Sequence, residues 1–175
     1  MIVIRIAGML ITMAASATFG LYMSSLGAFR RQDLLEMKKA LLILKSEIEY
    51  MASTLPDAME NIAARVSGPV SELFECFADA LQNNPEGETA YRLWLAAIDT
   101  NKKSTFLKAG DWEVIGGFGK TLGYLDKQMQ VDSIHFTMDY IDTQISELQE
   151  SSPKNERMFR SLGIIGGVLL LVVFW

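Results

Sequence analysis

The sequence predicts an all-α protein in which two apolar terminal segments flank a domain of about six helices. Three observations lead to this prediction. Residues 6–29 and 161–175 contain no charged side chain. Between these segments, apolar residues recur at intervals of three and four, which is the spacing of an amphipathic helix. Alternation of apolar and polar residues, which would indicate strands, is almost absent.

The N-terminal segment, residues 6–29, is long enough to cross a membrane. As a helix it would span roughly 36 Å, and a hydrocarbon core is about 30 Å thick. A cleavable signal peptide is the alternative, with Arg5 ahead of the apolar stretch and small residues at positions 15–17. Because the apolar stretch continues to Phe29, we favour a transmembrane helix over residues 6–29.

The C-terminal segment is shorter. Residues 161–175 would span roughly 22 Å as a helix. Met158 and Phe159 lengthen the segment if Arg160 extends its charge towards the membrane interface. We therefore predict a second transmembrane helix over residues 158–175 and a helical soluble domain over residues 30–157.

Basic residues near the predicted membrane helices indicate the topology. Most of them lie on the side of the middle domain: Arg30, Arg31, Lys38, Lys39, Lys154, Arg157 and Arg160. Only Arg5 lies beyond the first segment, so the positive-inside rule places the middle domain in the cytoplasm. The single cysteine, Cys76, fits a reducing compartment. The formal net charge of −5 argues against a nucleic-acid partner.

Helical spacing divides the middle domain into six segments. We predict helices over residues 30–53, 53–66, 70–81, 89–100, 111–123 and 126–150. The first continues the N-terminal segment, and its apolar stripe comprises Leu34, Met37, Leu41, Leu44, Ile48 and Met51. Pro56 suits the first turn of the second helix. Pro153 is expected to bend or break the approach to the C-terminal segment.

Residues 116–121, GGFGKT, resemble the end of a phosphate-binding loop. Such a loop needs a glycine five residues before its Gly-Lys-Thr, following a strand. That position is occupied by Val114, and the residues upstream do not form a convincing strand. We therefore expect neither a nucleotide nor another cofactor here.

On a helical projection, the same residues form a smooth face. Three glycines, Gly116, Gly119 and Gly123, lie together on the apolar side, beside Leu122 and near Phe118, whereas Lys120 points away. Each glycine costs roughly 1 kcal/mol of helix stability relative to alanine, which close approach of another backbone could offset. We predict a packing groove, with a flexible hinge as the alternative. Asp126 is either the N-cap of the next helix or a buried polar contact to a partner.

The sixth predicted helix carries two apolar stripes. One comprises Ile134, Met138, Ile141, Ile145 and Leu148, and the other Met129, Phe136 and Tyr140. Two interpretations remain: the helix is buried on both sides, or Phe136 and Tyr140 belong to a face offered to a partner protein. The only histidine, His135, shares a face with Asp132 and Asp139. We expect an exposed acidic face there and no metal, and no motif marks a catalytic nucleophile.

Three further stretches have recognisable patterns: FGKTLGYLDKQMQ (118–130), RSLGIIGGVLLLVV (160–173) and EIEYMASTLPDAMENIA (47–63). The first resembles the signature FGxxLGxxDxxxQ, the second a C-terminal membrane anchor, and the third the pattern EIxYxxTPLPEAxxxIA. Together they resemble the stage III sporulation protein AB family of endospore-forming bacteria. The one departure is Ser53-Thr54-Leu55-Pro56, where the family pattern has Thr-Pro-Leu-Pro.

The resemblance implies a non-enzymatic membrane subunit of the secretion-like complex that links mother cell and forespore. It further implies a soluble domain similar to the F-type platform domains of type II secretion and type IV pilus systems. The expected partners are other stage III sporulation subunits, including the secretion-type ATPase, at the mother-cell membrane facing the forespore. Small residues four apart, such as Gly163 and Gly167, would let the membrane helices pair with each other, in a homo-oligomer, or with other subunits. A membrane-anchored adaptor of another envelope complex is the alternative function.

Overall fold

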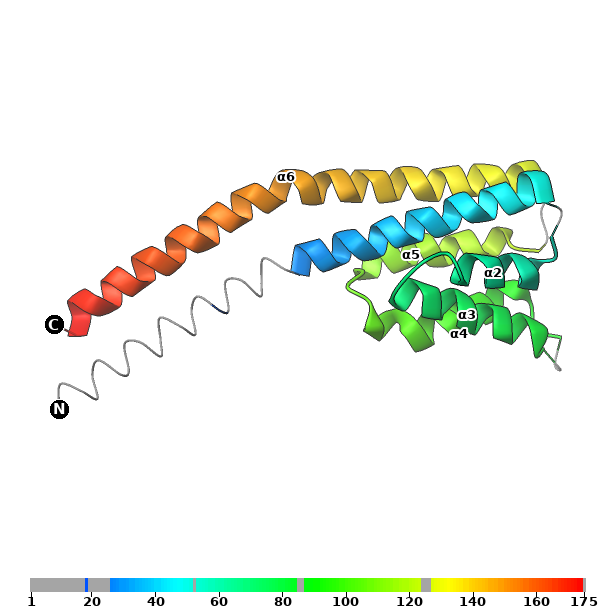
Figure 1. Cartoon of the computed structure of the whole chain (residues 1–175), viewed down its shortest axis with the longest axis horizontal. Coiled ribbons are helices and arrows are strands. Elements are labelled where there is room, and N and C mark those ends of the chain that lie inside the picture. Colours follow the sequence, from blue (N-terminus) through cyan, green and yellow to red (C-terminus); the bar gives the residue numbers. More distant parts are fainter. Residues whose placement is uncertain (1–17, 19–25, 52, 85–86, 124–126, 175) are drawn as a thin grey trace. The chain divides into compact units, whose positions relative to one another are not determined.

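The structure, a computed structural model, describes residues 18, 26–51, 53–84, 87–123 and 127–174, with side chains described as far as residue 150. Within these residues the chain forms six α-helices and no strand, which confirms the predicted all-α class (Figure 1). The helices are residues 26–46, α2 (Leu55–Ala63), α3 (Pro69–Gln82), α4 (Ala90–Asn101), α5 (Ala109–Phe118) and α6 (Lys127–Phe174).

The chain divides into two units. One is the compact unit Arg30–Ile145, and the other comprises Met1–Phe29 and Ser146–Trp175. Most of the first predicted membrane segment, 6–29, lies outside the described residues, and only the helical backbone of the second, 158–175, is described, as far as Phe174. In the part of the chain that the structure describes, no helix is both long and apolar enough to cross a membrane.

The helix starts follow the local sequence signals. Thr54 caps α2 by accepting a hydrogen bond from the backbone N–H of Asp57 (3.5 Å), and Pro56 lies in the first turn of the helix, as predicted. Thr89 caps α4 in the same way through Arg92 (3.3 Å). Of the two outcomes expected at Pro153, a bend or a break, the break is wrong, because the helical backbone of α6 continues through this residue.

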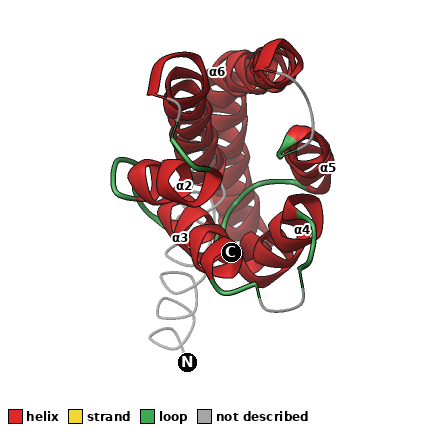
Figure 2. Cartoon of the chain, turned by 90° about the vertical axis from the view of Figure 1, so that its right-hand side faces the viewer, coloured by secondary structure: helices red, strands yellow, loops and turns green. Residues whose placement is uncertain are grey.

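Within the compact unit, α2 packs against α3, α3 against α4, and α4 against α5, so these consecutive helices are neighbours in space (Figure 2). The chain closes on itself because the helix over residues 26–46 lies antiparallel to the start of α6. Arg30, near one end of this helix, reaches Gln144 (2.7 Å), whereas Lys127 binds the backbone carbonyl of Glu49 at the other end. Lys38 bridges the same two helices through Asp142 (2.6 Å).

The core sits where these helices meet. Its apolar stripe on the first helix is confirmed for the four residues up to position 44: Leu34, Met37, Leu41 and Leu44 are all at most 2% exposed. Among the described residues, the largest fully buried side chain is Trp94 on α4. Its ring meets Phe74 and Phe77 of α3 at centroid distances of 5.6 and 5.1 Å. Aromatic pairs at such spacings add to the free energy gained by area burial.

A buried polar network joins three segments of the bundle. The guanidinium of Arg30 donates two hydrogen bonds to the carboxylate of Asp111 at the start of α5 (3.0 and 2.8 Å). Asp111 also accepts from the backbone N–H of Lys108 (2.7 Å) and from the Tyr140 hydroxyl on α6 (3.1 Å). Both side chains of the pair are nearly inaccessible, at 7% and 0% exposure. The network therefore fixes α5 to the first helix and to α6.

The network also sets the protonation of Asp111. Burial alone would raise the pKa of this carboxyl, but the Arg30 guanidinium, the Lys108 N–H and the Tyr140 hydroxyl outweigh burial and hold the pKa below its ordinary value. At Asp33 the balance is reversed, because burial raises the pKa more than the hydrogen bond from the Phe106 N–H (2.7 Å) lowers it.

Replacing Arg30 by Met should lower the free energy of unfolding by about 3–5 kcal/mol, because Asp111 would be left charged and unpaired in the core. The matched control is Lys38→Met, which removes the more exposed pair with Asp142 and should cost about 0–1 kcal/mol. Denaturant unfolding of both purified variants measures the difference.

The stabilisation that the Arg30–Asp111 pair contributes should depend on pH. The folded pKa of Asp111 is depressed, so the stabilisation from the pair is complete above the ordinary carboxyl pKa and is lost as the pH falls through the folded value. The gap between wild type and Arg30→Met should therefore narrow in acid. A gap that widens as the pH falls would contradict the assignment.

Candidate functional site

The glycine-rich motif does not form one continuous helix. α5 ends at Phe118, Gly119–Thr121 form a 3₁₀ turn, and Gly123 has a φ of +87°. The predicted helix over residues 111–123, with three glycines on one face, is therefore wrong at its C-terminal end. The chain has already left the helix at Leu122, whose backbone is extended, and Gly123 then adopts a left-handed conformation that side-chain-bearing residues rarely take.

Gly119 is the tightest position of the motif. A Cβ atom at residue 119 would lie 2.1 Å from Cδ1 of Trp94. The backbone at Gly119, with φ of −56°, suits any residue, so lack of space alone requires glycine here. The sequence analysis expected the backbone of another helix to approach here, whereas the close neighbour is the indole ring of Trp94.

Trp94 is held where it excludes a side chain at position 119. Its Nε1 donates a hydrogen bond to the backbone carbonyl of Ile115 (3.0 Å), and its ring meets Phe118 edge-on at 6.4 Å. Gly116 is buried one turn earlier, where an added Cβ would lie 3.5 Å from Leu95. Through these contacts with Trp94 and Leu95, residues 115–119 pack α5 against α4.

The remaining residues of the motif differ in burial and in their contacts. Phe118 and Leu122 are buried, whereas Lys120 is exposed, as the helical projection predicted. The hydroxyl of Thr121 donates to the Phe118 carbonyl (2.8 Å). No strand precedes the motif in the described residues, so Lys120 and Thr121 lack the setting of a phosphate-binding loop. Asp126 lies outside the described residues.

The second stripe of α6 is divided between core and surface. Phe136 is 70% exposed and Met129 is 51% exposed, so the interpretation that α6 is buried on both sides is wrong for these residues. Tyr140 is half-buried and belongs to the Arg30–Asp111 network. The hydrogen bond to Asp111 therefore accounts for a tyrosine at position 140. No core contact requires a large aromatic side chain at Phe136.

A π-helical turn, Glu47–Met51, ends the first helix and was missed by the sequence analysis. Its first residue, Glu47, is buried and accepts hydrogen bonds from Ser53 (2.7 Å) and from Asn61 of α2. A π turn carries more residues than an α turn, so the side chains after it point in new directions. The predicted inward position of Met51 is wrong, since this residue is 60% exposed, and Tyr50 beside it is 80% exposed.

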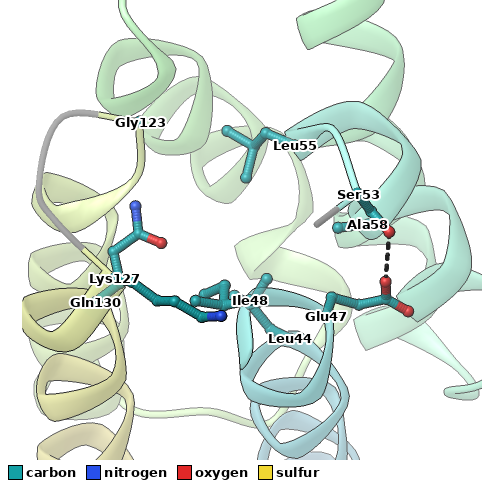
Figure 3. A pocket seen from close by; sticks show the side chains of 9 residues that line it. All are labelled: Leu44, Glu47, Ile48, Ser53, Leu55, Ala58, Gly123, Lys127 and Gln130. Carbon is teal, nitrogen blue, oxygen red and sulfur yellow. Dashed lines mark hydrogen bonds between the residues drawn. The ribbon is translucent and has the colours of Figure 1, made fainter. Parts of the chain in front are cut away.

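A cavity of about 350 Å³ lies at this end of the bundle (Figure 3). It is lined by residues of the first helix and π turn, the start of α2, Gly123 and the start of α6: Leu44, Glu47, Ile48, Ser53, Leu55, Ala58, Gly123, Lys127 and Gln130. Leu55 extends into it from α2, and the Ser53–Glu47 hydrogen bond closes one side. Apolar and polar groups are mixed, with no pair of groups arranged for acid–base chemistry.

His135, Asp132 and Asp139 are all exposed. Among the side chains that the structure describes, no group of three or more His, Cys, Asp or Glu residues could hold a metal ion. What the described surface offers instead is large apolar side chains, above all Tyr50, Met51 and Phe136.

Replacing Gly119 by Ala should lower the free energy of unfolding by about 1–3 kcal/mol, because the new methyl group would overlap the Trp94 ring. Gly117→Ala is the matched control, since an added Cβ there has no neighbour within 4 Å. In a helix this control should raise stability by up to about 1 kcal/mol. Equal effects of the two substitutions in denaturant unfolding would refute the steric explanation.

Known proteins provide an independent comparison. A family model described as stage III sporulation protein AB matches residues 5–175. Stage III sporulation protein AB of Bacillus subtilis (strain 168) is 28% identical over 170 residues, covering 97% of this chain and 98% of that protein. A solved structure of a stage III sporulation protein AB superposes with a TM-score of 0.66 and 26% identity, covering 71% of this chain and 97% of that one. The chain therefore belongs to the stage III sporulation protein AB family.

Proposed function

We propose that this chain is a structural subunit of the secretion-like complex that connects mother cell and forespore during sporulation, and that it acts through contacts with other proteins. Family membership supports the sporulation role. The observation that carries the contact role is the exposure of Tyr50 and Phe136 on a well-packed bundle. Aromatic side chains of this kind dominate the binding free energy of protein interfaces.

The proposal includes two membrane anchors, over residues 6–29 and 158–175. Their support is the sequence, because both segments combine length with a near absence of charge. Basic residues beside them favour a cytoplasmic domain, and the proposed location is the mother-cell membrane facing the forespore. Basic side chains such as Arg31 and Arg157 would lie near anionic lipid headgroups.

The proposal assigns the chain no catalytic activity. The loop-like GGFGKT stretch is explained by packing, since Gly119 makes room for Trp94 and Lys120 projects into solvent. We propose that the partners are other stage III sporulation subunits, including the secretion-type ATPase of the complex, and that nucleic acid is not among them. The net negative charge agrees with this choice of partner class.

Tyr50→Ser and Phe136→Ser should each reduce the number of heat-resistant spores while leaving the thermal unfolding of the purified chain unchanged. Both side chains are exposed, so their loss removes binding surface rather than core packing. Truncating an anchor aromatic at an interface costs about 2 kcal/mol or more of binding free energy.

Two control variants accompany this test. Glu113→Ser alters an exposed side chain of α5, and Lys120→Ala removes the lysine of the loop-like motif. Both should sporulate normally. If Lys120→Ala alone abolished sporulation and the two aromatic variants had no effect, the contact role would be refuted and nucleotide chemistry would need to be reconsidered.

A reporter fused near Asn84, in the loop between α3 and α4, should be active only in its cytoplasmic form. The reason is the excess of basic residues on the domain side of both terminal segments. Paired alkaline phosphatase and fluorescent protein fusions make the measurement. Phosphatase activity at this position would overturn the proposed topology.

A further inference from the structure

We propose that a second copy of this chain is a docking partner, and that Phe136 of one copy inserts into a groove beside Leu42 of the other. The proposal deepens the scaffold role above and rests on it. Two surfaces of the compact unit carry the argument. One is an apolar groove with a basic rim, and the other is an exposed aromatic side chain between two acids.

The groove lies on the outer face of the first helix. It encloses about 560 Å³ and is lined by Lys39, Leu42, Ile43, Ser46, Glu47, Met51 and Arg65. Leu42 and Met51 are 47% and 60% exposed, although both are large apolar side chains. The π turn creates this surface, because it carries Met51 away from the core stripe and towards the outer face.

The outward charge of the groove is positive. Lys39 and Arg65 are both exposed at its rim. The two acids in the neighbourhood are turned to internal partners: Glu47 is buried against Ser53 and Asn61, and Glu36 accepts from the backbone N–H of Ser67 (3.0 Å). Glu36 lies 3.9 Å from Lys39, which leaves the ammonium half-exposed and weakly paired. The rim therefore favours an acidic partner.

The opposite charge pattern occurs on α6. Phe136 is flanked by Asp132 four residues before it and Asp139 three residues after it, which places the two carboxylates beside the ring on one helix face. All three residues are exposed. An exposed aromatic side chain between two acids complements an apolar groove between two basic residues.

One chain cannot satisfy both surfaces by itself. The groove is lined only by the first helix, the π turn and the chain after α2, whereas Phe136 points to solvent from α6. A second copy brings the two together in a contact between unlike surfaces, which can repeat around a ring. Confinement of the copies to one membrane would raise their effective concentration, so a small interface would suffice.

Cross-linking between two tagged copies tests this contact in the full-length chain. In a Cys76→Ser background, one copy carries Ser46→Cys inside the groove and the other carries His135→Cys beside Phe136. A short bismaleimide should then join the two tags. The matched control replaces His135→Cys by Thr100→Cys on the exposed side of α4 and should give no product above background. Equal yields from the two pairs, or no product from the first, would overturn the proposal.

Charge reversal tests the chemistry of the same contact. Lys39→Glu with Arg65→Glu in one copy should reduce the cross-linked product about tenfold, which corresponds to about 1.4 kcal/mol of binding free energy. Asp132→Lys with Asp139→Lys in the other copy should do the same. Combining the two reversed copies should restore the product. Failure of this rescue would show that the charges do not face each other.

The outcome is separable from the proposed function. If Phe136→Ser lowers sporulation but the cross-linked pair does not form, the surface binds a different protein and the second-copy contact is refuted while the scaffold role stands. If the cross-link forms and charge reversal abolishes both the product and sporulation, the contact between copies is part of that role.

Discussion

The fold depends on the contact between Trp94 and Gly119. The indole is the largest fully buried side chain, and it occupies the space where residue 119 would place a Cβ atom. Around it, Phe74 and Phe77 come from α3, Phe118 from α5, and the Ile115 carbonyl accepts its hydrogen bond. A single side chain therefore joins three helices, and the glycine-rich motif is best understood as the surface that accommodates it.

The sequence predicted the elements that depend on local signals. The position of Pro56 in the first turn of α2 and the apolar stripe from Leu34 to Leu44 follow from proline geometry and helical periodicity, and the structure confirms them. Periodicity failed after Leu44, because the π turn depends on Glu47 reaching Ser53 and Asn61, which lie later in the chain. It failed again after Phe118, where α5 gives way to a 3₁₀ turn and then to an extended backbone at Leu122, although the pattern would continue the helix.

The candidate site was predictable only in part. The sequence indicated that the glycines permit a close approach. It could not identify the neighbour, Trp94, because that contact depends on how α4 and α5 pack. The Arg30–Asp111 pair had no sequence signal beyond an arginine beside an apolar segment and an aspartate in the first turn of a helix. Exposure was the least predictable property: Phe136 and Tyr140 share a stripe, but only Tyr140 finds a polar partner in the network.

The residues that hold the helices together differ from the apolar residues that are exposed on the surface. The Trp94 cluster and the Arg30–Asp111 network hold the helices, and the large apolar residues that they do not need lie on the π turn and on α6. The account's central claim is that these outward residues contact other proteins. A photoreactive amino acid at Tyr50, introduced into sporulating cells and compared with the same group at Leu95, tests this claim most directly. The account predicts cross-links from residue 50 to sporulation proteins or to a second copy, and none from residue 95. Normal sporulation without any cross-link from residue 50 would contradict it.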